Sequence, residues 1–153
     1  MRLTRTVHEL SCALAVDMAR AAAEHAAGLG IQICVAVVGR DGHLRAFQRM
    51  DGAPFLSIQI SQDKAKTAAA FGVNTHELFA MLSGSPAVRE GLPHVSGFSF
   101  LGGGVPVKWQ DEVIGGIGVS GGSEERDAEC AMAALKLLHP RKQKVLFAFQ
   151  ERV

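Results

Sequence analysis

The feature that most constrains this chain is the stretch 113–122, in which branched apolar residues alternate with glycines before a Ser-Gly-Gly turn. The apolar residues predict a buried strand, and the turn opens directly into an amphipathic helix. Glycine is favoured where a backbone turns through a positive φ or approaches another group closely. A second cluster, Gly102-Gly103-Gly104, lies just upstream. The two clusters predict either the walls of a pocket or tight turns of a sheet.

Composition limits the classes of function that this chain can have. Its 153 residues, 48% hydrophobic and 20% charged, are typical of one globular domain. A formal net charge of +1 is too small to attract nucleic acid or an anionic membrane, so we expect neither partner. The N-terminus does not resemble a signal peptide, and no apolar run is long enough to span a bilayer. Cys12, Cys34 and Cys130 predict buried thiols in a reducing, cytoplasmic compartment.

Hydrophobic periodicity predicts the order α β β α α β β β α. The expected helices cover 6–27, 55–71, 74–82 and 123–139, and the expected strands cover 31–38, 43–50, 98–101, 105–109 and 113–120. Hairpin connections favour a mainly antiparallel sheet covered by helices. Residues 84–97 predict an irregular lid or pocket wall. The stretch 144–149 alternates basic and apolar residues and predicts an edge strand, a subunit arm or a frayed tail.

Two helix starts carry capping signals. Asn74 is a favourable N-cap residue, and Glu77, three positions later, can complete a capping box. Ser123 is expected to cap the last helix, with Glu124 and Glu125 in the first turn, where they complement the helix dipole.

His25 falls on the inward stripe of the first helix, close to its end. One interpretation is a core histidine that has its hydrogen bond or offsets the helix dipole. The other is a ligand to a metal or to haem iron, because neutral imidazole is a common metal donor.

Charged residues at strand and helix ends are further candidates. Arg49 and Asp51 end the second strand, where loop residues often act in function, although they could equally form a local ion pair. Lys64 lies on a partly apolar face of the second helix. It either extends to solvent or is held in a pocket, where a lysine suits acid–base chemistry or carboxylate binding.

Several segments occur together in an order and spacing that resemble the GlcG/HbpS family, which includes the C-terminal domain of PduO-type corrinoid adenosyltransferases. These segments are 33–38, 41–44, 49–53, 64–68, 103–106 and 114–122, followed by Asp127. The resemblance covers roughly 5–138, so we expect one domain over 1–139 and a C-terminal extension over 140–153. It implies an α/β (α+β) profilin-like fold, in which a five-stranded antiparallel sheet is flanked by helices. It also implies a homo-oligomer.

The resemblance leads to two main hypotheses of function. In the first, the chain binds or handles haem, with His25 as the metal ligand and Arg49 or Lys64 for a propionate. The other residues expected to bind the cofactor are Thr67, Gly103, Gly104, Gly118 and Ser120.

In the second hypothesis, the chain is a cofactor-independent enzyme acting on a small hydroxy or keto acid of a catabolic pathway. Lys64 would hold the carboxylate, Asp51 or Asp127 would act as the base, and the glycine bends would donate to an oxyanion. A third possibility is a non-catalytic assembly subunit that uses its alanine-rich faces and the 144–149 arm.

Overall fold

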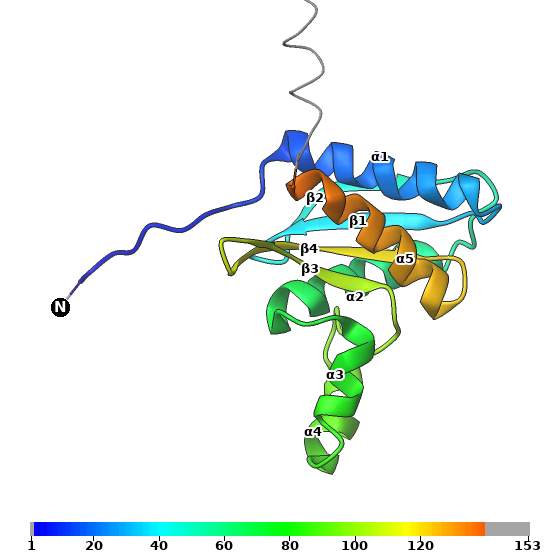
Figure 1. The fold of residues 1–153 in the computed structure, drawn as a ribbon. Helices are drawn as coiled ribbons and strands as arrows, with labels where there is room; N and C mark the ends of the chain where they lie inside the picture. The colour runs from blue at the N-terminus through cyan, green and yellow to red at the C-terminus, as the bar shows by residue number, and fades with distance from the viewer. Residues whose placement is uncertain (1, 140–153) are drawn as a thin grey trace, which may run out of the picture.

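An antiparallel sheet of four strands forms the middle layer of the domain (Figure 1). The computed structural model describes residues 2–139. The strands are β1 (Cys34–Gly39), β2 (Leu44–Arg49), β3 (Gly104–Trp109) and β4 (Glu112–Ser120), in the order β2-β1-β4-β3. β1 is buried along its whole length, as its continuous apolar run predicts for a central strand.

Helices cover both faces of the sheet (Figure 1). On one face lie α1 (Cys12–Gly28) and α5 (Glu124–Leu135), which pack against each other, and on the other lies α2 (Ser57–Phe71). Two short helices, α3 (Thr75–Met81) and α4 (Pro86–Gly91), project from the α2 side (Figure 1). Single 3₁₀ turns follow α4 at Leu92–His94 and α5 at Lys136–Leu138.

The glycines of β4 have a packing role that follows from the two-residue period of a strand. Ile117 and Val119 join the large core cluster beneath α1 and α5. Gly116 and Gly118, which alternate with them, face α2. A Cβ atom at Gly116 would lie 3.0 Å from the backbone nitrogen of Ala69, so only glycine lets the helix backbone approach this closely.

The expected five-stranded sheet is wrong in one respect, because residues 98–101 form no strand. These residues lie beside α2 instead: the Ser99 amide donates to Thr67 Oγ1 at 2.9 Å, and Phe98 packs edge-on against Phe71. The mixed α+β class and the antiparallel sheet flanked by helices are confirmed. The profilin-like topology stays a prediction.

The first helix begins at Cys12, capped by Ser11, rather than at Thr6. The preceding residues are bonded to the strand ends instead of continuing the helix. The Leu10 amide donates to the Ile114 carbonyl at 3.2 Å, and the Arg40 amide donates to Glu9 at 3.1 Å. These bonds satisfy backbone groups outside the helix, which explains why helical periodicity in the sequence places the start too early.

Other local predictions had mixed outcomes. Residues 84–97 include α4 and a 3₁₀ turn, so they are less irregular than expected. Ser123 caps α5, but the Asn74 side chain donates to Glu77 at 3.2 Å and caps nothing. The stretch 144–149 lies outside the described residues.

The three cysteines are free thiols. Cys34 and Cys130 are buried as predicted, whereas Cys12 is exposed. Burial, together with the charges of Asp127 and Glu129, raises the pKa of Cys130 to about 11, so this thiol stays protonated near neutral pH. Within residues 2–139, no helix is long and apolar enough to cross a membrane.

Candidate functional site

One end of the sheet, which we call the glycine end, gathers most of the residues that the sequence singled out. Cys34 of β1 pairs with Arg49 on one side and with Ser120 on the other, so β2 and β4 finish at the same end of the sheet, with β1 between them. Gly104 pairs with Gly118, which places the start of β3 at the same end. Gly121 and Gly122 then pack against residues 31–33, the segment that follows α1.

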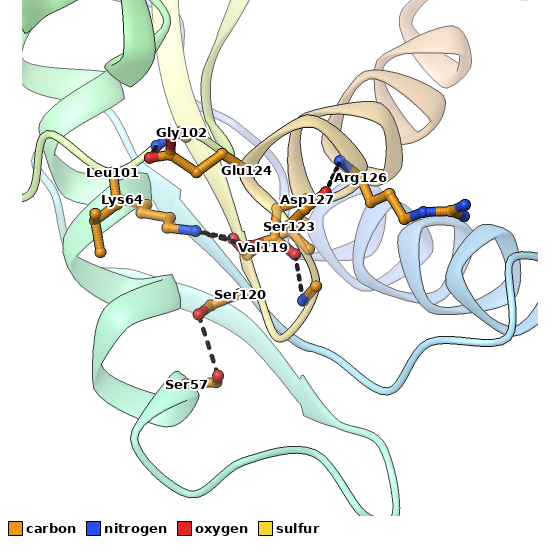
Figure 2. Close-up of polar contacts among 12 residues, drawn as sticks. Ser57, Lys64, Leu101, Gly102, Val119, Ser120, Ser123, Glu124, Arg126 and Asp127 are labelled. Carbon is orange, nitrogen blue, oxygen red and sulfur yellow. Dashed lines mark hydrogen bonds and ion pairs between the residues drawn. The ribbon is translucent and has the colours of Figure 1, made fainter.

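Lys64 and Asp127 form a buried ion pair at the glycine end (Figure 2). Each residue is only 2% exposed. Lys64 Nζ donates to Asp127 Oδ2 at 2.9 Å and to the Val119 carbonyl at 2.8 Å. Asp127 Oδ1 accepts from the Gly122 amide at 2.9 Å. Because α2 and α5 lie on opposite faces of the sheet, this pair joins the two helical layers past the end of β4. Lys64 is therefore held inside the protein rather than extended to solvent.

The two glycine bends converge, but other protein atoms fill the space beside them. A Cβ atom at Gly103, whose φ is +115°, would lie 2.8 Å from Asp127 Cβ and 3.1 Å from Lys64 Nζ. A Cβ atom at Gly104 would lie 2.5 Å from Thr75 Cγ2. The glycines thus leave room for the ion pair and for Thr75, rather than for an open hollow.

Polar side chains tie the ends of the strands to the helices. Glu124 accepts a hydrogen bond from the Gly102 amide at 2.6 Å, and Thr75 Oγ1 accepts from the Gly104 amide at 3.0 Å (Figure 2 shows the first). Ser120 Oγ donates to Ser57 Oγ at 3.1 Å, so it bonds within the protein at the start of α2. Side chains from three helices, α2, α3 and α5, therefore hold the strand ends in place at the glycine end.

His25 lies near the end of α1, one-third exposed, and its Nε2 is 2.8 Å from Glu129 Oε1 on α5. The residues after it, Ala27 and Gly30, line a cavity of about 510 Å³ together with Arg49, Met50 and Asp51. His25 and Arg49, the predicted iron ligand and propionate partner, therefore flank the same end of the domain.

Arg49 does not form the local ion pair considered above. Its Nη2 donates to the Ala53 carbonyl at 2.9 Å, and within residues 2–139 no ion pair joins it to Asp51.

Thr67 is separate from the glycine end and lines a different cavity, beside the β1–β2 turn. In the described part of the chain, no group of three or more His, Cys, Asp or Glu side chains could hold a bare metal ion.

Sequence reasoning missed the partners that position these groups. Glu129 and Thr75 carried no recognised signal, and Glu124 was interpreted only as a complement to the helix dipole. His25 and Glu129 are 104 positions apart, and they meet only because α1 packs beside α5. A local motif cannot reveal such a pair.

The protein is thus a small α+β domain, in which an antiparallel sheet lies between two helical layers and a buried ion pair closes one end. Residues 10–136 match the family described as "Haem degrading protein HbpS-like", and the chain belongs to this family. The resemblance drawn from the sequence is therefore confirmed. A 15.0 kDa protein of the dhaT–dhaS intergenic region in Citrobacter freundii is 34% identical over 136 residues, which are 88% of this chain and 96% of that protein. Protein GlcG of Escherichia coli K12 is 34% identical over 111 residues, or 72% of this chain and 81% of GlcG.

Solved structures agree with the fold. A double mutant of HbpS from Streptomyces reticuli has a TM-score of 0.80 and 36% identity, covering 89% of this chain and 90% of that one. A structure described as a PduOC–haem complex has a TM-score of 0.77 and 32% identity, covering 84% of this chain and 94% of that chain.

Proposed function

We propose that this protein binds haem at the end of α1, with His25 as the ligand of the iron. The observation that carries the proposal is the 2.8 Å contact between His25 Nε2 and Glu129 Oε1. Histidines that ligate metals usually bond through the second ring nitrogen to a carboxylate or carbonyl, which orients the ring and raises its basicity. With Nε2 at Glu129, Nδ1 is the nitrogen left for iron, and the side chain is one-third exposed.

The cavity at this end of the domain, which Ala27 lines two residues after His25, offers the other groups that haem requires. Arg49 supplies a cation for a propionate, because the bonds that it makes to Ala53 occupy Nε and Nη2 and leave Nη1. Ala27, Ile31 and Met50 add apolar surface. Haem bound there would supply the redox and oxygen chemistry of its iron, while the protein would fix the axial ligand and the polarity around it.

The related proteins point to the same ligand. The family description names haem degradation, and a PduOC chain 32% identical to this one is described as a haem complex. By contrast, the enzyme hypothesis has less support in the geometry. Lys64 and Asp127, its proposed carboxylate anchor and base, are both 2% exposed and neutralise each other. We therefore do not advance it as a second function.

We also expect a homo-oligomer in the cytoplasm. The projecting helices α3 and α4 carry apolar side chains that stay about half exposed or more, namely Phe79, Met81 and Val88. Exposed apolar groups gathered on one projection are typical of protein contact surfaces. The free thiols fit a reducing compartment.

Hemin titration tests the haem proposal. We expect the wild-type protein to shift the Soret band of hemin, and His25→Ala to abolish that shift because the axial nitrogen is lost. Glu129→Gln should retain binding but weaken it by about 10–100-fold, the usual effect of losing a partner that orients a metal ligand.

His94→Ala is the matched control, because His94 is an exposed histidine on the 3₁₀ turn after α4. It should bind hemin as the wild type does. A Soret shift that survives in His25→Ala, or that disappears equally in His94→Ala, would remove His25 from the role of iron ligand.

A further inference from the structure

A second cavity, of about 480 Å³, lies at the opposite end of the sheet from the glycine end. The β1–β2 turn, the last two turns of α2 and the loop after α4 form its walls. We call it the Lys66 cavity. None of its lining residues belongs to the proposed haem site, and Thr67, which the sequence assigned to cofactor binding, lies in this cavity instead.

One wall of the Lys66 cavity is apolar and partly open. Phe71 and Phe98 meet edge to face with ring centroids 5.9 Å apart, and Phe71 remains 44% exposed. Leu92 and Val95 extend this wall, and Val95 is 56% exposed. Such a surface suits the aromatic or branched body of a small ligand.

Lys66 provides the positive charge of the cavity. Within residues 2–139 no carboxylate lies within ion-pair distance of its Nζ. Asp63, one turn earlier on α2, accepts from Gln59 Nε2 at 2.7 Å instead. Gly97, whose φ is +82°, leaves room for the lysine stem, because a Cβ atom there would lie 3.2 Å from Lys66 Cδ. The glycine backbone thus lies close to the lysine stem at the cavity wall, and Asp63 Oδ1 lies 4.0 Å from the same Cβ position without forming an ion pair with the ammonium group.

The other polar groups set the charge that the ligand can carry. Arg40 is already paired with Glu112 at 2.7 Å. The His43 amide, bonded to Asp41 Oδ1 at 3.0 Å, lowers the pKa of Asp41, so this carboxylate on the cavity wall stays ionised. A second negative charge on the ligand would therefore face Asp41. Thr67, which is 2% exposed, accepts from the Ser99 amide and has no acceptor for its own proton among the described contacts.

From these groups we infer that the Lys66 cavity binds a small monocarboxylic acid with an aromatic or branched apolar body. The carboxylate contacts Lys66 Nζ and the Thr67 hydroxyl, and the body packs on Phe71 and Phe98. The site is independent of the proposed haem site, because the two lie at opposite ends of the sheet.

Calorimetric titration with phenylpropionate tests this inference. We expect the wild-type protein to bind phenylpropionate and Lys66→Met to weaken binding about tenfold or more, the range for losing a hydrogen bond to a charged group. Thr67→Val should weaken it less. Phenylpropanamide, which keeps the ring and loses the charge, and propionate, which keeps the charge and loses the ring, should both bind at least about tenfold more weakly than phenylpropionate.

The matched control is Lys108→Met, which removes an exposed lysine from β3 outside this cavity. It should leave the affinity unchanged. The inference is overturned if wild-type protein does not bind phenylpropionate, if Lys108→Met weakens binding as much as Lys66→Met, or if the amide binds equally well. Binding should persist in His25→Ala, so failure of the haem proposal and failure of this one are distinguishable.

Discussion

Replacing Lys64 with Met is expected to lower the free energy of unfolding by about 3–5 kcal/mol, the usual effect of breaking a buried ion pair. The substitution leaves Asp127 charged, 2% exposed and without its cation. It also removes a donor from the Val119 carbonyl. Urea denaturation followed by circular dichroism would measure the loss.

A double variant separates the ion pair from simple packing. Lys64→Met combined with Asp127→Leu should regain most of the lost stability, because replacing both partners of a buried pair by apolar groups is often neutral or stabilising. Lys136→Met, which changes an exposed lysine after α5, should stay within about 0.5 kcal/mol of wild type. A single Lys64→Met variant as stable as wild type would show that the pair contributes little and would reopen a catalytic role for this lysine.

The sequence predicts the scaffold well where the signal is local. The apolar run that ends at Gly39 becomes β1, and the return strand after the hairpin turn becomes β2. The glycine-rich stretch becomes β4. The segment 98–101 fails as a strand because its apolar residues have another use. Three aromatic contacts, Phe71 with Phe98, Phe98 with Phe100 and Phe79 with Phe100, bind the segment to α2 and α3. A short apolar run does not reveal whether it will pair as a strand or pack as a loop.

The candidate site is harder to predict because its contacts are long-range. The sequence identified Lys64 and Asp127 separately, but they are 63 positions apart, and their pairing depends on where α2 and α5 meet the sheet. The same holds for His25 and Glu129. The glycines were assigned to a pocket because glycine allows close approach of any group. Only the register of β4 shows that the group approaching Gly118 is the α2 backbone.

Gly118→Ala tests this packing role and is expected to lower the free energy of unfolding by about 4 kcal/mol or more, a loss that only steric or core defects usually produce. The new Cβ atom would overlap the Ser61 carbonyl oxygen and lie 2.5 Å from the Ala65 backbone nitrogen. Neither group is the end of a flexible side chain, so α2 must move away from β4. Thermal and urea unfolding of the purified variant would measure the loss.

Gly28→Ala is the control, since a Cβ atom at this residue of α1 would meet nothing within 4 Å. Its stability should change by no more than about 1 kcal/mol, because alanine favours a helix. If both variants were equally stable, the space beside Gly118 would be open in solution. The glycine end would then have the hollow that the sequence first predicted, and Lys64 and Asp127 would again be candidates for binding a small molecule there. A large loss confined to Gly118→Ala would instead assign the glycines of β4 to helix packing. Ligand binding would then be left to the cavity beside Arg49 and to the Lys66 cavity.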